Sequence, residues 1–228
     1  MLTFDGPAGP LAALLDLPAA DRGTHAALFC HPHPQYGGTM HSKVVYRAAR
    51  AARDLGIPTL RFNFRGTGGS AGTFDDGRGE AEDARSALDF LSERFPGRAL
   101  IAGGYSFGSW VAMRVGAADE RVSALIGIGT ATTVFGTEFL QAIAKPALFV
   151  QGTADRLGPI AELEAALAAR AGAAPARTRI ARIEGAEHLF IGHETEVYAA
   201  VREFLAEFIA GSVPGRPTGP TEGSMAST

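Results

Sequence analysis

Short apolar runs alternate along the chain with longer stretches in which apolar residues recur every three or four positions. Continuous apolar runs of this length are typical of strands buried on both faces of a sheet. The longer stretches have the spacing of amphipathic helices, with charged residues on the opposite side. The pattern predicts strands over residues 26–31, 59–64, 99–103, 123–128, 147–151 and 179–183, and helices over 41–55, 80–95, 107–117, 160–171 and 194–210.

This alternation predicts one α/β domain over residues 1–210, with a mostly parallel central sheet and helices on both faces. Residues 2–17 contain two apolar runs around a Gly-Pro-Ala-Gly turn, which predicts a β-hairpin at the edge of the sheet. Residues 211–228 are rich in Gly, Pro, Ser and Thr and have no hydrophobic period. We expect this tail to be disordered or to have been added by cloning.

Composition narrows the partners that the chain can have. Hydrophobic residues make up 46% and charged residues 20% of the 228 residues, and the formal net charge is −3. A weakly acidic chain has no electrostatic attraction for nucleic acid or an anionic membrane, and the apolar runs are far shorter than a membrane span. The single cysteine, Cys30, excludes an internal disulfide framework. We therefore expect a cytoplasmic protein with no nucleic-acid or membrane partner.

The segment Gly104-Tyr105-Ser106-Phe107-Gly108 follows a predicted buried strand and begins a predicted helix. It matches the G-x-S-x-G pattern of a serine raised on a sharp strand-to-helix turn, whose neighbours must be small so that strand and helix can approach each other. The helix N-terminus beneath the serine also favours negative charge. A glycine-rich turn could serve packing alone, and the pattern also arises by chance in a chain with 29 glycines. Its position after the strand favours Ser106 as a catalytic nucleophile.

The acid and the base that would serve this serine follow it in the chain in the order serine, acid, histidine. Only His188 and His193 come after Ser106. His188 lies in a loop after a predicted strand, whereas His193 begins the last predicted helix and is better explained as a cap or surface residue. Asp155 directly follows a predicted strand, where it could orient the imidazole, although a capping role is the alternative. Glu184 is the fallback acid.

The loop after the strand at 26–31 is a candidate to hold the charged oxygen of a reaction intermediate. One donor in such sites is the N–H after the nucleophile, here that of Phe107, and the second comes from this earlier loop. Pro32 and Pro34 have no N–H to donate, which leaves His33 and Gln35. We favour His33 and keep Gln35 as the alternative.

The same loop invites a metal-site interpretation, because Cys30, His31, His33 and His41 are close in sequence. A proline separates the two nearest histidines, and no set of His, Cys and carboxylate residues has zinc spacing. We therefore expect no metal and no other cofactor. His31 is predicted to form structural hydrogen bonds, and Cys30 to pack inside its strand.

Five segments carry a resemblance to a known family: HPHPQYGGTM at 31–40, RFNFRGTGGSAGTFDDGRGE at 61–80, GGYSFGSW at 103–110, GTAD at 152–155 and GAEHLF at 185–190. Together they resemble the small bacterial α/β hydrolases related to dienelactone hydrolases, over residues 2–209. The resemblance implies an α/β-hydrolase fold without a cap domain and a triad of Ser106, Asp155 and His188. Dienelactone hydrolases use cysteine at the position of Ser106, a difference that favours ester over lactone chemistry.

These residues together predict a carboxylesterase that acts on small or short-chain acyl esters through an acyl-enzyme. A peptidase or amidase, a thioesterase, and a non-catalytic binding protein on the same fold are the alternatives. The expected partner is a small-molecule ester, and a homodimer is left open. Besides the triad and the oxyanion donors, the predicted pocket residues are Gln35, Tyr36, Phe135, Leu157 and Leu189.

Overall fold

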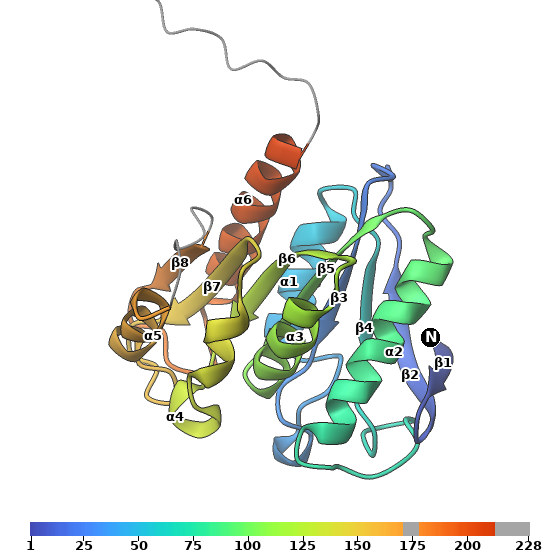
Figure 1. Cartoon of the computed structure of the whole chain (residues 1–228), viewed down its shortest axis with the longest axis horizontal. Helices are drawn as coiled ribbons and strands as arrows, with labels where there is room; N and C mark the ends of the chain where they lie inside the picture. The colour runs from blue at the N-terminus through green and yellow to red at the C-terminus, as the bar shows by residue number, and fades with distance from the viewer. Residues whose placement is uncertain (171–177, 213–228) are drawn as a thin grey trace, which may run out of the picture.

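The computed structural model describes residues 1–170 and 178–212. Its strands form one eight-stranded sheet in the order β1-β2-β4-β3-β5-β6-β7-β8 (Figure 1). β2 pairs antiparallel with both β1 and β4, and all other neighbouring strands are parallel. The strands are β1 Leu2–Gly6, β2 Gly9–Asp16, β3 His25–Cys30, β4 Thr59–Phe62, β5 Ala99–Tyr105, β6 Val122–Ile128, β7 Ala147–Gly152 and β8 Thr178–Ile183.

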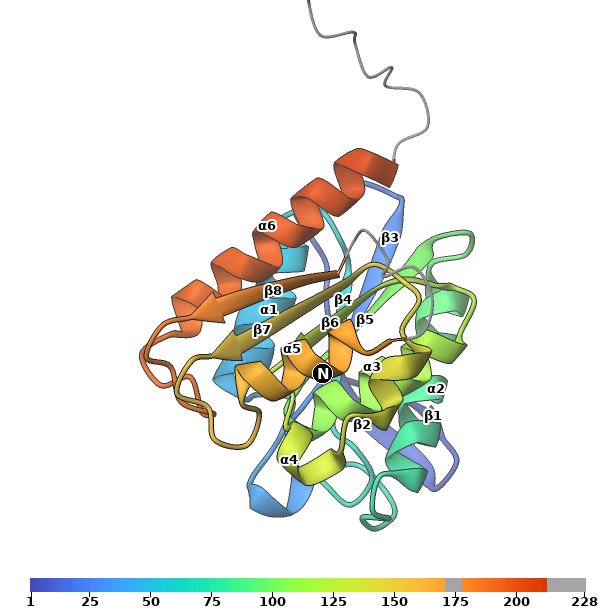
Figure 2. The same ribbon diagram turned by 60° about the vertical axis from the view of Figure 1, so that its left-hand side comes forward.

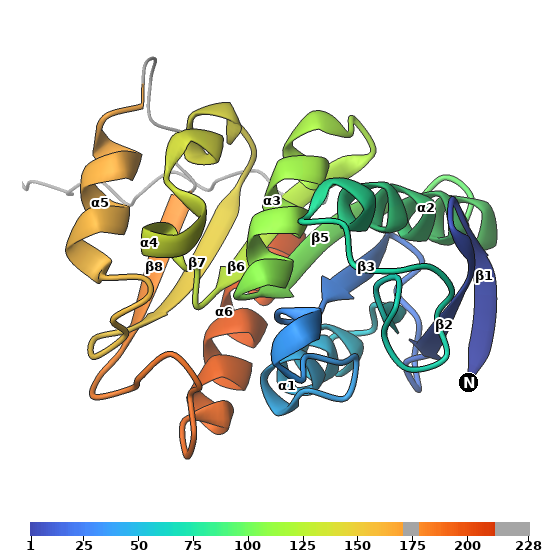
Figure 3. The ribbon, with the colours of Figure 1, turned by 90° about the horizontal axis from the view of Figure 1, so that it is seen from below.

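Helices cover both faces of this sheet, as the alternation of elements predicts. Figure 3 shows three layers, with α1 and α6 on one face and α2, α3, α4 and α5 on the other. α1 and α6 pack against each other on the face of the sheet that they share (Figure 2). The helices are α1 Lys43–Arg53, α2 Arg78–Arg94, α3 Phe107–Ala118, α4 Thr132–Phe135, α5 Ile160–Ala168 and α6 Glu194–Ser212.

A hydrophobic core lies on each side of the sheet. Alternate residues of β3 point to opposite sides. Leu28 and Cys30 join the core that contains residues of α2 and α3, whereas Ala27 and Phe29 join the core that contains residues of α1 and α6. All residues of β3 are buried. A strand buried on both faces explains the continuous apolar run that is visible in the sequence.

The predicted strands and helices all form, and most of their ends lie within two residues of the predicted positions. α5 ends at Ala168, before the predicted end at residue 171, which lies outside the described residues. α6 continues to Ser212 and includes the first residues of the predicted tail. Residues 213–228 lie outside the described part of the chain, so the expectation of a disordered or added tail is not tested.

The N-terminal hairpin and the connection between β6 and β7 both have the form that the sequence predicts. β1 and β2 make the predicted hairpin, with Gly9 at φ 114° in its turn, and β1 is an edge strand. Between β6 and β7 the chain forms only α4 and a 3-10 turn at Glu138–Ala142. Residues 1–170 and 178–212 thus contain no cap domain.

Across the described residues, no helix combines the length and the apolar character that crossing a membrane requires.

Candidate active site

Ser106 stands on the sharp turn between β5 and α3. Its backbone has φ 55° and ψ −118°, a conformation that L-residues rarely adopt, and its N–H donates to Ile128 O at 2.9 Å. A Cβ on Gly104 would lie 2.2 Å from the carbonyl oxygen of Gly108, and a Cβ on Gly108 would lie 2.4 Å from that of Cys30. Both positions therefore require glycine, which is the physical reason for the G-x-S-x-G spacing.

The structure brings Ser106, His188 and Asp155 into one hydrogen-bonded series. His188 Nε2 lies 2.9 Å from Ser106 Oγ, and His188 Nδ1 lies 2.9 Å from Asp155 Oδ2. The three residues follow β5, β8 and β7, and the carboxyl ends of parallel strands meet at one edge of the sheet. Because an ionised Asp155 can only accept, the proton of a neutral His188 lies on Nδ1, and Nε2 can accept the hydroxyl proton of Ser106.

Three further donors hold the Asp155 carboxylate, which is fully buried. Gln151 Nε2 donates to Oδ2 at 2.7 Å, and the N–H groups of Leu157 and Gly158 donate to Oδ1 at 2.9 and 3.1 Å. Gln151 is itself fixed, since it also donates to Gly158 O at 2.7 Å and accepts from the N–H of Thr130 at 2.9 Å. Sequence reasoning missed Gln151, although a polar residue near the end of an apolar strand was the visible signal.

Replacing Gln151 by leucine is expected to lower both stability and activity. The change leaves the buried N–H of Thr130 and the carbonyl of Gly158 without their partner, which costs about 2–4 kcal/mol of unfolding free energy. It also removes one donor from Asp155. Urea denaturation measures the loss, and Gln141→Leu, at an exposed position, is the matched control. Equal stability of the two variants would contradict the structural role of Gln151.

The loop that carries His188 is held in place by a hydrogen bond to its backbone and by a buried aromatic side chain. Tyr105 Oη donates to the carbonyl oxygen of His188 at 2.8 Å. Phe190 is fully buried, and its backbone has φ 52°. The alternative residues lie elsewhere, since the His193 ring bonds to a glutamate of α6 and Glu184 is exposed after β8. The anchored loop holds the imidazole of His188 toward Ser106.

The backbone N–H groups of Phe107 and His33, the two predicted oxyanion donors, have no acceptor among residues 1–170 and 178–212. Phe107 is the first residue of α3. The N–H of Gln35, the alternative donor, is used locally, because it donates to His33 Nδ1 at 3.3 Å. His33 and Ser106 line the same cavity. Of the two predicted sources for the second donor, the structure thus favours His33.

His31 and Cys30 have structural surroundings. His31 Nδ1 donates to Pro32 O at 2.6 Å, and its Nε2 accepts from the N–H of Phe64 at 3.0 Å. Burial raises the pKa of the Cys30 thiol, which keeps it protonated. Both residues match their predicted packing and hydrogen-bonding roles. Within the described ranges, no three His, Cys, Asp or Glu side chains come together as metal ligands would.

Lowering the pH from 6.5 to about 4 is expected to destabilise the fold through His31. Burial lowers the pKa of His31 from 6.5 to about 4. Between pH 6.5 and pH 4 the unfolded chain binds a proton at His31 that the folded chain does not. The free energy of unfolding therefore decreases by up to about 3 kcal/mol as the pH is lowered across this range. NMR titration of the His31 ring measures the midpoint, and a midpoint near 6.5 would contradict the expectation. Burial also lowers the pKa of His25. Urea denaturation of the parent and of His25→Gln at pH 6.5 and at pH 4 therefore separates the contribution of His31 from that of His25.

A cavity of about 550 Å³ opens beside Ser106. Of the predicted pocket residues, Tyr36, Leu157 and Leu189 line it. Residues from the N-terminal ends of α1 and α6 line it as well, which the sequence did not indicate, because it does not show that these two helices are neighbours. The lining residues that were not predicted include Ser42, Lys43, Val44, Tyr105, Ile191 and Glu194.

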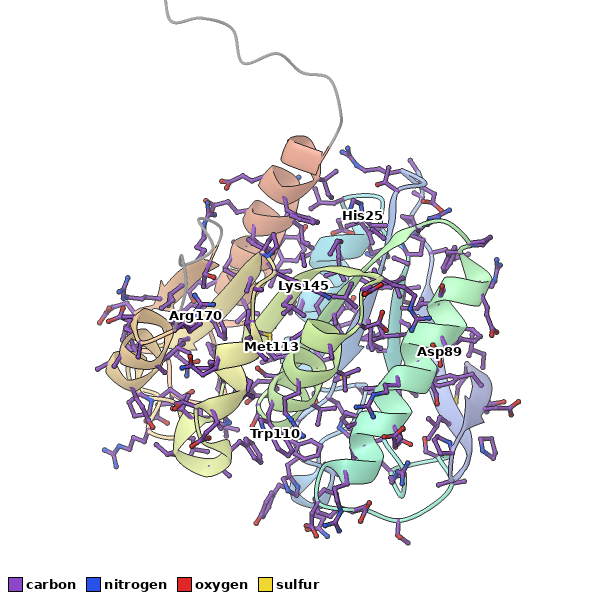
Figure 4. The ribbon with its side chains drawn as sticks, in the orientation of Figure 1. His25, Asp89, Trp110, Met113, Lys145 and Arg170 are labelled. Atoms are coloured by element: carbon purple, nitrogen blue, oxygen red, sulfur yellow. The ribbon has the colours of Figure 1, made fainter. Side chains whose placement is uncertain are left out.

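Two predicted pocket residues lie elsewhere. Phe135 of α4 stacks on Trp110, with ring centroids 4.8 Å apart, and Trp110 lies at the end of α3 near α4 (Figure 4). Gln35 is within a 3-10 turn at Pro34–Tyr36, and of the turn's residues it is Tyr36 that lines the cavity. The described residues that line the cavity include neither Gln35 nor Phe135. A turn presents adjacent residues to different sides, so sequence proximity to the loop was not sufficient.

The chain is similar to known proteins over most of its length. A family model described as serine aminopeptidase, S33, matches residues 28–139. An uncharacterised protein of Rickettsia prowazekii is 32% identical over 209 residues, which cover 89% of this chain and 87% of that protein.

Two solved structures are similar throughout. An α/β serine hydrolase homologue from Coxiella burnetii is 32% identical, with a TM-score of 0.82 over 90% of this chain and 96% of that one. An α/β serine hydrolase without a lid from Xanthomonas campestris is 33% identical, with a TM-score of 0.82 over 95% of each chain. The chain therefore belongs to the α/β serine hydrolases, and its described residues have the lidless form of that fold.

Proposed function

We propose that the chain is a carboxylesterase that hydrolyses small or short-chain acyl esters through an acyl-enzyme on Ser106. The observation that carries the proposal is the series of 2.9 Å contacts from Ser106 to His188 and from His188 to Asp155. A serine hydroxyl is a weak nucleophile until an adjacent base accepts its proton. Here His188 Nε2 is within hydrogen-bond distance of that proton, and Asp155 keeps the ring in the required tautomer.

The two unpaired N–H groups support the oxyanion part of the proposal. As Ser106 Oγ attacks the ester carbon, the carbonyl oxygen becomes negative and needs donors that are already in place. The N–H groups of Phe107 and His33 have this role in the proposal. Burial lowers the pKa of the His33 imidazole, and the neutral ring accepts the N–H of Gln35, which stiffens the loop.

Three finer expectations belong to the same proposal. A relation to dienelactone hydrolases within the α/β serine hydrolases rests on the sequence segments described above. The proposed partner is a small-molecule ester, with a homodimer as the oligomer to look for. The proposed location is the cytoplasm, which the single buried Cys30 favours because the chain needs no oxidising compartment.

Acyl transfer to the serine tests the proposal directly. We expect p-nitrophenyl acetate to release p-nitrophenol and to leave one acetyl group on the peptide that contains Ser106, as seen by mass spectrometry after an acid quench. We also expect faster cleavage of p-nitrophenyl acetate than of p-nitroacetanilide. An acetyl group on another residue would overturn the nucleophile, and faster cleavage of the anilide would replace the esterase with an amidase or peptidase.

A further inference from the structure

Exposed apolar side chains gather around the serine. Among the described residues, eight large hydrophobic side chains are exposed, and four of them line the cavity that contains Ser106 and His188. We call these four the apolar rim. Surface hydrophobic residues that occur singly need no explanation, whereas a cluster beside a polar centre indicates a binding surface. The rim consists of Tyr36, Leu157, Leu189 and Ile191, which are 87%, 42%, 63% and 77% exposed.

The rim is held rigidly rather than left to collapse. Phe190, between Leu189 and Ile191, is fully buried at φ 52°, so its neighbours on both sides point outward. Its N–H donates to Glu187 O at 3.0 Å. The contact of Tyr105 with the carbonyl of His188 fixes the same loop. A loop that is anchored in this way presents two apolar side chains to water permanently, which is favourable only when something apolar covers them.

The chemistry of His188 decides which half of an ester lies there. In the first step His188 Nε2 takes the proton of Ser106 as Oγ bonds to the acyl carbon. When the tetrahedral intermediate collapses, the bond from that carbon to the alcohol oxygen breaks, and Nε2 gives the proton to the departing oxygen. The alcohol oxygen must therefore come within hydrogen-bond distance of Nε2. Leu189 and Ile191 belong to the same loop as His188 and line the same cavity, so they lie close to the imidazole that meets the departing alcohol oxygen.

Granted the proposed esterase activity, we propose that the apolar rim binds the alcohol half of the substrate. The preferred substrates are then small acyl esters of apolar alcohols with an alkyl or aryl group. A cavity of about 550 Å³ has the size of a small-molecule site. The acyl half lies away from the rim and stays on Ser106 after the alcohol has left.

A series of alkyl acetates tests the inference because its members share one acetyl-enzyme and differ only in the alcohol. We expect kcat/KM to rise from methyl through butyl to hexyl acetate, by up to about fourfold per methylene group, until the chain passes the rim. In the variant Leu189→Ser/Ile191→Ser, the ratio of kcat/KM for hexyl over methyl acetate should fall about tenfold. Leu17→Ser is the matched control, because Leu17 is 56% exposed and lies outside this cavity.

The outcomes separate the two proposals. If the parent hydrolyses all alkyl acetates at equal kcat/KM, or if the double variant keeps the parent ratio, the rim does not bind the alcohol. If instead the variant loses its preference along a series of methyl acetate, butyrate and hexanoate, the rim binds the acyl half, and the inference is wrong while the esterase proposal stands. If no ester is hydrolysed, or if hydrolysis persists in Ser106→Ala, the esterase proposal fails together with the inference.

Discussion

Replacing Ser106 by alanine is expected to lower kcat for ester hydrolysis by at least about 10⁴-fold. The variant removes the hydroxyl oxygen that forms the acyl-enzyme in the proposed reaction, while His188 and the N–H groups of Phe107 and His33 remain in place. Alanine adds no atom to the turn, since serine already has a Cβ at this φ of 55°. The fold should therefore be unchanged, and the effect should appear in the rate alone. Steady-state hydrolysis of p-nitrophenyl acetate measures it.

Ser92→Ala is the control for this experiment. Ser92 lies on α2 at a partly exposed position away from the cavity, and alanine is favourable in a helix. We expect its kcat to remain within about twofold of the parent value and its thermal unfolding to be unchanged. Activity of Ser106→Ala within tenfold of the parent would show that another group attacks the ester.

Replacing Asp155 by asparagine is expected to lower kcat by about 10⁴-fold without unfolding the protein. The N–H groups of Leu157 and Gly158 donate to Oδ1, so the amide oxygen of asparagine will stay on that side. The amide nitrogen then faces His188 Nδ1 and donates to it. This moves the imidazole proton to Nε2, where it points at Ser106, and the ring can no longer act as a base.

Asp5→Asn is the matched control for this change, because Asp5 is an exposed residue of β1 on the far edge of the sheet. It should leave kcat unchanged. The amide nitrogen of the Asp155 variant also faces the donor Nε2 of Gln151, so a modest loss of stability should accompany the loss of rate. A variant that keeps most of its activity would mean that another carboxylate orients His188.

Much of the site could be predicted because each triad residue directly follows a predicted strand or lies in the loop after one. Parallel strands have their carboxyl ends at one edge of the sheet, so the strand pattern alone predicts that Ser106, Asp155 and His188 lie close together. The glycines at 104 and 108 reported a close approach of backbone that only glycine permits. The two prolines beside His33 reduced the candidates for the second N–H to two.

The pocket was less predictable, for physical reasons. α4 is a single turn, too short to have a hydrophobic period, so the direction of Phe135 toward Trp110 could not be read. Lys43 and Glu194 are the first residues of α1 and α6, and they reach one cavity because those helices are neighbours. Contacts between segments so far apart in the chain leave no periodic pattern. Gln151 was missed because its strand is otherwise apolar and its partners are backbone groups.

The packing of α1 against α6 also determines when folding can be completed during synthesis of the chain. α1 is synthesised well before α6, so the part of its surface that packs against α6 has no cover until α6 has been made. Ser106 and Asp155 are synthesised before this point, whereas His188 lies directly before α6 in the chain. Domains fold as units once their distant parts are present. We therefore expect a nascent chain that still lacks α6 to be inactive toward p-nitrophenyl acetate.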